Sequence, residues 1–161
     1  MTFLHLLRHA HAGDAMTWEG PDATRPLTDK GSLQADRLGH FLADRGFVTD
    51  VIITSPLVRA RQTGEIVADI LQAPLAIEDR LGAVLDVSTL EAILAGHGDP
   101  TGPVLVGHDP DFTDLVAMLC GAAGVPMRKG SLARIEIDRP LEPAGGTLRW
   151  LIPPDLLRPE R

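Results

Sequence analysis

The sequence has a single cysteine, no tyrosine and only 4% aromatic residues among its 161 positions. Because Cys120 is alone, no disulfide can form within the chain, and a disulfide-stabilised secreted scaffold is excluded. We interpret Cys120, which lies in an apolar stretch, as an unreactive core thiol. No apolar run approaches the ~20 residues of a membrane-spanning helix. The N-terminal run is interrupted by His5 and ended by Arg8, too early for the core of a signal peptide. We therefore expect a cytoplasmic protein that is not bound to a membrane.

Positive charge is also scarce in this chain. It has 15 Lys and Arg against 22 Asp and Glu, a formal net charge of −7. Nucleic acids and anionic membranes bind clustered cations, so the overall balance argues against both as partners.

The composition is 44% hydrophobic and 23% charged, which is enough to build a buried core at this length. We expect one domain over residues 1–161, acting as a monomer.

Short apolar segments alternate with helical patterns along the chain. The predicted strands are the short apolar runs at residues 3–7, 51–54, 75–77 and 103–106, of which 51–54 and 103–106 are expected to be buried. Two segments that alternate in polarity predict a hairpin-like pair, at residues 132–137 and 147–152. The predicted helices fill the intervals and begin near Thr28, Ser55, Ser88 and Asp111. This order predicts an α/β fold, a three-layer sandwich whose central sheet is mostly parallel with an antiparallel edge.

Cationic side chains follow three of the predicted strands. Arg8 and His9 come directly after the first strand, Arg59 lies in the helix after the second, and His108 follows the run at 103–106. In open α/β sheets, ligands bind beyond the carboxyl ends of the strands, so these groups should meet at one edge. A helix start near Ser55 would add backbone N–H groups that favour an anion. Together these features predict a phosphate pocket, with Asp109 as the one carboxylate in the immediate motifs.

Four sequence blocks carry a resemblance to a known family. Arg8-His9-Ala10 resembles the Arg-His-Gly signature of the histidine phosphatase superfamily, the phosphoglycerate mutase-like group, with Ala10 where Gly is commoner. The other blocks are Arg25-Pro26-Leu27-Thr28, the segment from Ser55 to Thr63, and Val106-Gly107-His108. Their order and spacing, and the short length of the chain, resemble the small phosphohistidine phosphatases of the SixA type. The resemblance implies a phosphoglycerate mutase-like fold over nearly the whole chain.

The resemblance also implies a catalytic role for four residues. His9 would attack phosphorus and become transiently phosphorylated, Arg8 and Arg59 would bind the phosphoryl oxygens, and His108 would stabilise the transferring group. This agrees with the chemistry, because phosphoryl transfer needs an in-line nucleophile and preorganised positive charge. The planar guanidinium of arginine suits a phosphoryl group better than the ammonium of lysine does.

Further residues are assigned to the surroundings of the phosphate. We interpret Ser55 as a helix cap that presents the helix start to the ligand, and Arg25 as either a tether of the loop at residues 10–27 or a capping residue. Both are candidates for binding phosphate or substrate. Arg128 and Lys129 are interpreted as cations that are solvated or lie at the rim of the site, and Arg61 as solvated.

The kind of leaving group that the enzyme can release depends on whether the pocket holds a proton donor. Members of the family that cleave phosphate esters place a Glu or Asp beside the phosphate, whereas Gly82 or Ala83 occupies the corresponding stretch here. A phosphohistidine needs less help, because its leaving imidazole carries an ionisable nitrogen of its own. Asp86, Asp22 or Glu19 could still reach the site from a loop and supply the acid for an ester.

The function predicted from the sequence is removal of the phosphoryl group from a phosphorylated histidine of a protein, releasing inorganic phosphate. The protein partner could be a phosphotransfer domain of a two-component relay. The alternatives are a small-molecule phosphomonoesterase or mutase of the same fold, and a phosphate-binding module without turnover. A metal site built from His9, His11 and His108 is disfavoured, because Arg8 and Arg59 would repel a cation. We therefore expect neither a metal nor another cofactor.

Overall fold

A six-stranded mixed sheet forms the centre of the computed structural model, which describes residues 1–159. The strand order is β3-β2-β4-β1-β5-β6. The strands are β1 Thr2–Arg8, β2 Ile52–Thr54, β3 Leu75–Ile77, β4 Val104–Gly107, β5 Leu132–Ile137 and β6 Thr147–Ile152. The first four in this order pair in parallel, and β5 and β6 add an antiparallel edge next to β1. The predicted mostly parallel sheet with an antiparallel edge is confirmed.

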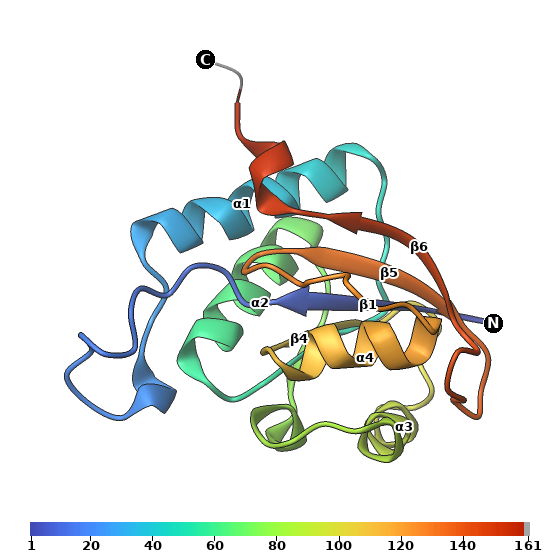
Figure 1. Cartoon of the computed structure of the whole chain (residues 1–161). Coiled ribbons are helices and arrows are strands. Elements are labelled where there is room, and N and C mark those ends of the chain that lie inside the picture. The colour runs from blue at the N-terminus through green and yellow to red at the C-terminus, as the bar shows by residue number, and fades with distance from the viewer. Residues whose placement is uncertain (160–161) are drawn as a thin grey trace.

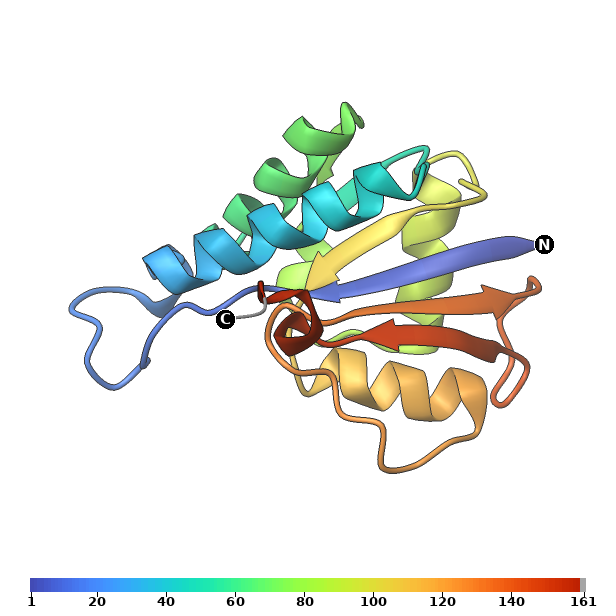
Figure 2. The same ribbon diagram turned by 90° about the horizontal axis from the view of Figure 1, so that it is seen from above.

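Helices cover both faces of this sheet, which confirms the predicted three layers (Figures 1 and 2). The helices are α1 Asp29–Asp44, α2 Val58–Leu71, α3 Val87–Gly96 and α4 Asp111–Cys120. Three short 3-10 turns complete the elements: η1 Asp22–Thr24, η2 Asp79–Gly82 and η3 Pro154–Leu157. Within residues 1–159, no helix is both long and apolar enough to cross a membrane.

The alternation of side chains along β1 explains how one strand serves two core layers. Leu4 and Leu6, both 0% exposed, belong to the core cluster that contains the apolar residues of α3 and α4. Leu7, 1% exposed, points to the other face and packs with residues of α1 and α2. A strand that is buried on both faces therefore reads as a continuous apolar run, which is why the sequence predicts it well.

Helix starts were the less accurate part of the prediction. Thr28 caps α1 as expected, since its Oγ1 accepts a hydrogen bond from the N–H of Gly31 at 3.1 Å. The predicted start at Ser55 is wrong, because α2 begins at Val58, and Ser55 lies in the preceding turn. The start predicted near Ser88 is one residue late, because α3 begins at Val87 and Asp86, not Ser88, caps it by accepting from the N–H of Thr89 at 2.7 Å. Asp and Ser are about equally good caps, so the sequence alone does not distinguish them.

The parallel strands β1, β2 and β4 end at the same edge of the sheet. Backbone hydrogen bonds continue beyond their ends: His9 N–H donates to the carbonyl of Gly107, and Ser55 N–H donates to the carbonyl of Val106, both at 3.0 Å. The residues that follow the three strands are thereby kept side by side. The long loop after β1 projects from the body at this edge (Figures 1 and 2).

Candidate active site

His9 is a buried, neutral imidazole at the carboxyl end of β1. The residue is only 5% exposed, and its Nδ1 is 2.8 Å from the carbonyl oxygen of Ala10. A carbonyl oxygen can only accept, so Nδ1 carries the proton and Nε2 keeps its lone pair. Burial lowers the pKa of His9 to about 3, and the positive charges around it add to this effect although the Ala10 hydrogen bond opposes it. The ring is therefore neutral near pH 7, with Nε2 available as a nucleophile.

His108 lies beside His9 and is held by Ser55. The two imidazole ring centroids are 5.3 Å apart. The Nε2 of His108 is 2.7 Å from the Oγ of Ser55, which is itself fully buried and also accepts from the N–H of Leu57 at 3.2 Å. Burial lowers the pKa of His108 to about 4, and the nearby guanidinium of Arg59 lowers it further. Instead of capping α2, Ser55 therefore orients the second histidine.

Arg59, near the start of α2, binds a carboxylate from the projecting loop. The residue is 7% exposed, and its two terminal nitrogens donate to the carbonyl oxygen and to Oδ2 of Asp22 at 2.9 and 3.0 Å. Arg25 donates from Nε to Oδ1 of the same Asp22 at 3.1 Å, and from Nη1 to the carbonyl of Ala12 at 2.8 Å. Arg25 is thus placed as a tether of the loop, and Asp22 bridges two guanidinium groups.

Asp22 is ionised in this arrangement. Desolvation would raise the pKa of its carboxyl, but the hydrogen bond from Arg25 and the charge of Arg59 outweigh it, so the pKa lies below its usual value. Asp109 is the one carboxylate in the immediate motifs, and Asp22 is the one of the three predicted loop acids that reaches the pocket. Asp22 lies 37 positions before Arg59 in the sequence, and only the folding of the loop brings the two side chains together.

Arg8 is positioned by a small network on the other side of the site. Its Nη1 donates to the carbonyl of Met127 at 2.8 Å and lies 3.5 Å from Oδ2 of Asp109. Thr113 ties these partners together, because its hydroxyl donates to Asp109 at 2.7 Å and accepts from the N–H of Met127 at 3.0 Å. The Nε atoms of Arg8 and Arg59 have no hydrogen-bond partner within residues 1–159, so both retain a donor for a bound anion.

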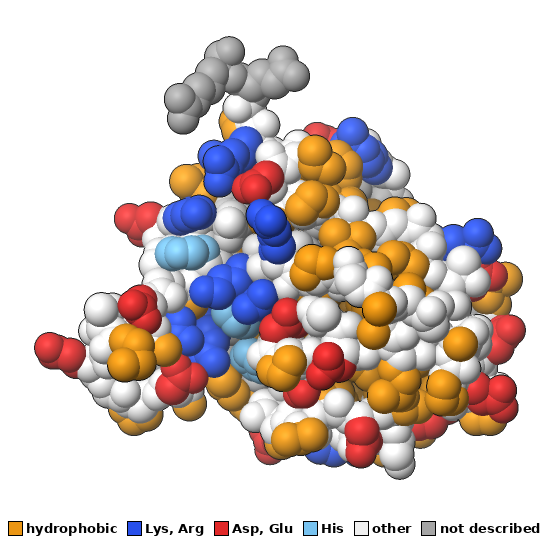
Figure 3. Space-filling view, viewed as in Figure 1, with side chains coloured by type: hydrophobic (Ala, Val, Ile, Leu, Met, Phe, Trp, Pro, Cys, Tyr) orange, Lys and Arg blue, Asp and Glu red, His pale blue; other side chains and the backbone are white. Residues whose placement is uncertain are grey.

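Lys129 joins the cationic group from the segment before β5. The N–H of Gly130 donates to the carbonyls of Arg8 and His9 at 3.1 and 3.0 Å, which fixes this segment against the first motif. Burial and the nearby positive charge of Arg8 lower the pKa of Lys129. Arg128, in contrast, has a 73% exposed side chain and lies 3.9 Å from Asp155. Lys and Arg side chains gather around His side chains in the hollow beside the projecting loop (Figure 3).

The other predicted acids do not provide a proton donor at the phosphate. A Cβ on Gly82 would lie 3.1 Å from Leu57 and 3.2 Å from Pro56, so this stretch does lie against the turn that carries Ser55, but it holds no carboxyl group. Asp86 is occupied as the cap of α3. Glu19 is exposed and makes no hydrogen bond or ion pair with the described residues. Asp22 is the acid that reaches the site, and it arrives ionised.

The remaining candidates have structural partners. The Nδ1 of His11 lies 2.7 Å from the hydroxyl of Thr28, and Arg61 is paired with Glu65 at 3.3 Å on α2. In the part of the chain that the structure describes, no group of three or more His, Cys, Asp or Glu side chains is arranged to hold a metal ion. The site instead presents positive charge and two neutral imidazoles, which suit an oxyanion.

Comparisons with known proteins identify the family of the chain. The model of the histidine phosphatase superfamily (branch 1) matches residues 4–84. The phosphohistidine phosphatase SixA of Escherichia coli strain K12 is 32% identical over 154 residues, covering 92% of each chain. A solved protein histidine phosphatase SixA in complex with tungstate has a TM-score of 0.82 at 26% identity, covering 98% of this chain and 100% of that chain. The alpha-ribazole phosphatase of Shigella flexneri shares the fold, with a TM-score of 0.72 at 20% identity over 95% of this chain and 97% of that chain. On these matches and on the order of its motifs, the chain belongs to the histidine phosphatase superfamily and is a hydrolase of that group.

Proposed function

We propose that the chain is a phosphohistidine phosphatase, which removes the phosphoryl group from a phosphorylated histidine of a protein through a phospho-His9 intermediate. The observation that carries the proposal is the protonation state of His9. Its Nδ1–H donates a hydrogen bond to the carbonyl of Ala10, and its Nε2 carries an unprotonated lone pair near Arg8 and Arg59. A nucleophilic histidine has to be neutral, and the pKa of about 3 keeps it so over the physiological range.

The proposed reaction has two displacements at phosphorus. In the first, the lone pair on Nε2 of His9 forms a new N–P bond while the N–P bond of the substrate breaks. The substrate ring carries a proton on its second nitrogen, so it departs as neutral imidazole. In the second, water attacks the phosphorus of phospho-His9, the N–P bond breaks, and inorganic phosphate leaves with the second proton passing to solvent. Arg8 and Arg59 hold the phosphoryl oxygens in both steps, and His108 stabilises the transferring group.

The absence of a poised acid favours a phosphoramidate over an ester. An alkoxide leaves poorly without a proton, and in the described residues no protonated carboxyl reaches the phosphate position. The imidazole of a phosphohistidine needs no such donor. A cleft that is open at the surface also suits a phosphorylated side chain presented by a protein (Figure 3). The protein partner of the proposal is a histidine phosphotransfer domain of a two-component relay.

One observation favours the second candidate, a small-molecule phosphomonoesterase. The carboxylate of Asp22 is 3.0 Å from Arg59, so an acidic side chain does lie next to the proposed phosphate position. If substrate displaced it from Arg59 and Arg25, it could approach a leaving oxygen, and burial by the substrate would have to raise its pKa above the usual value for it to donate a proton near pH 7. Single-domain organisation, a monomeric state and a cytoplasmic location stay predictions.

The experiment compares wild type, His9→Ala and His11→Ala on three substrates: a phosphohistidine protein, phosphoramidate and a simple phosphate ester. We expect wild type to release phosphate fastest from the first two and to form an acid-labile phosphoenzyme. His9→Ala should lose both properties, whereas His11→Ala, which removes an imidazole two residues away, should keep them. Full turnover by His9→Ala would overturn the proposal, and faster hydrolysis of the ester would favour the second candidate. Absence of phosphate release from every substrate would identify a binding module.

A further inference from the structure

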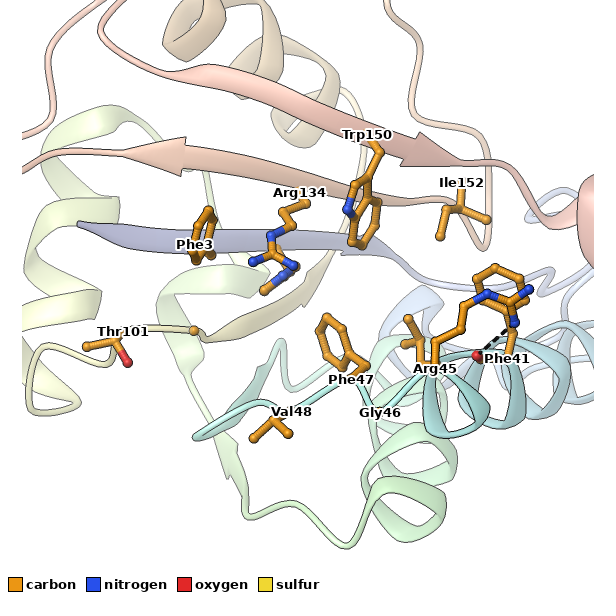
Figure 4. Close-up of a pocket in the computed structure, with 13 residues that line it drawn as sticks. Phe3, Phe41, Arg45, Gly46, Phe47, Val48, Thr101, Arg134, Trp150 and Ile152 are labelled. Atoms are coloured by element: carbon orange, nitrogen blue, oxygen red, sulfur yellow. Dashed lines mark hydrogen bonds between the residues drawn. The ribbon is translucent and has the colours of Figure 1, made fainter.

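A cavity of about 620 Å³ lies at the end of β1 remote from His9 (Figure 4). It is bounded by the last turn of α1, the segment that follows this helix, and the face of strands β1, β5 and β6. Its wall carries four aromatic and two cationic side chains: Phe3, Phe41, Phe47, Trp150, Arg45 and Arg134. This volume is typical of sites for small molecules. None of the residues proposed for catalysis lines it.

The floor of the cavity is a row of polar side chains that lies next to an apolar row on the same face of the sheet. Arg134 of β5 is directly opposite His5 of β1 and Trp150 of β6, and residues opposite one another in antiparallel strands share a face. The next row toward the catalytic edge pairs Leu7 with Leu132, which are 1% and 0% exposed. Leucines cover the face where helices pack on it. An arginine and a tryptophan replace them where the helices end and the cavity begins.

The two guanidinium groups of the cavity are stacked on aromatic rings and lack acidic partners. The Cζ of Arg134 is 3.9 Å from the ring centroid of Phe3, and the Cζ of Arg45 is 3.7 Å from that of Phe41. Across residues 1–159, neither guanidinium has a carboxylate within 4.0 Å. Stacking holds the guanidinium plane in place while its N–H edge stays available to a carboxylate or sulfonate. In a chain of net charge −7, two such cations facing one cavity favour an anionic ligand.

His5 adds a buried acceptor to the floor. It is 2% exposed, its Nδ1 donates to the carbonyl of Pro103 at 3.0 Å, and its Nε2 has no partner within the described residues. Burial lowers the pKa of His5 to about 4, so Nε2 is an unprotonated acceptor near pH 7. The carboxylate of Asp50 is nearby, but its oxygens accept from the N–H groups of Thr101 and Gly102 at 2.7 and 3.2 Å. Within residues 1–159 it forms no ion pair with Arg45 or Arg134.

We propose that this cavity is a second binding site, for a small aromatic anion whose ring lies among the aromatic side chains and whose acidic group binds Arg134, with Arg45 at the mouth. The aromatic wall supplies stacking surface, and the guanidinium groups supply charge-assisted hydrogen bonds. The inference is independent of the reaction at His9, because it rests on residues at the other end of the sheet.

The test uses two fluorescent dyes with the same aromatic skeleton. One is 8-anilinonaphthalene-1-sulfonate, and the other is N-phenyl-1-naphthylamine, which lacks the sulfonate. Trp150 lines the cavity and Trp18 lies in the projecting loop, so the Trp18→Phe background leaves Trp150 as the only tryptophan. We expect the sulfonate dye to bind at one site per chain, to quench Trp150 by energy transfer, and to bind more tightly than the neutral dye.

The cationic residues are then tested one at a time. Arg134→Met should weaken binding of the sulfonate dye roughly ten- to hundredfold, as expected for one lost charge-assisted contact, and should leave the neutral dye unaffected. Arg45→Met should act in the same direction. Arg37→Met removes the same charge from α1 outside the cavity and should change nothing, and unchanged phosphatase activity in all three variants would report intact folding. Equal binding of both dyes, insensitivity to Arg134, or displacement of the sulfonate dye by inorganic phosphate would each overturn the proposal.

Discussion

Replacing Asp22 by Asn should tighten the binding of an oxyanion at Arg59. In the structure Asp22 occupies one edge of the Arg59 guanidinium, with Oδ2 at 3.0 Å from Nη2. A tetrahedral oxyanion that binds the same edge has to displace this carboxylate and also meets its negative charge. Asn has the same shape, and its amide oxygen still accepts from Arg25, so the loop should keep its position while the competing charge is removed.

The size of the effect follows from the exposure of the pair. The side chain of Asp22 is 56% exposed and that of Arg59 is 8% exposed, so solvent screens much of their attraction. Ion pairs of this kind contribute up to about 1 kcal/mol, which corresponds to at most about a fivefold change in Kd. We therefore expect Asp22→Asn to bind inorganic phosphate about two- to fivefold more tightly, and the difference to shrink at high salt.

Isothermal titration with inorganic phosphate near pH 7 measures this change, since Asp22 is ionised there. Glu19→Gln is the matched control: it removes one charge from the same loop without touching Arg59, and should leave Kd unchanged. A weaker rather than tighter complex in Asp22→Asn would refute the reasoning. It would mean that the carboxylate positions Arg59 for the anion instead of competing with it.

Three further predictions concern other parts of the molecule. Arg59→Lys should lower kcat/KM about ten- to hundredfold, because an ammonium cannot reproduce two charge-assisted contacts. The control is Arg61→Lys, which lies on the outer face of α2 and should leave steady-state rates unchanged. The folded pKa of His5, about 4, lies below its unfolded value of 6.5, so its contribution to stability is present above pH 6.5 and is lost as pH falls toward 4. By pH 5 the free energy of unfolding should have fallen by about 2 kcal/mol through this residue alone. Urea unfolding at pH 8 and at pH 5 measures the fall, which should be smaller by this amount in His5→Phe than in wild type. Gly31→Ala would place a Cβ 2.0 Å from the carbonyl oxygen of His11, so α1 has to shift. We expect the free energy of unfolding to fall by roughly 1–3 kcal/mol, which a thermal melt measures. An unchanged Tm would contradict this close approach of helix and loop.

The strands and the order of the motifs could be predicted from the sequence because each depends on neighbouring residues. The run from Leu4 to Leu7 is apolar throughout except for His5, since both faces of β1 are covered, and the length and alternation of such runs suffice to place the sheet. The topological rule for parallel strands then assigns His9 and His108 to one edge. The start of α3 could not be fixed from the sequence, because Asp86 and Ser88 are about equally favourable N-caps two residues apart, and only the backbone conformation selects one.

The sequence by itself determined the family of the chain, its α/β layers and the set of cations and imidazoles that gather at one end of the sheet. The tertiary structure alone decided what each of those groups contacts. It places Asp22 against Arg59, which are 37 positions apart in the sequence, and Ser55 against His108, which are 53 positions apart. It also put Arg134 between His5 and Trp150 at the far end of the sheet. Such contacts join residues that are distant in the chain, and they depend on strand register and loop path, which no local pattern of residues encodes.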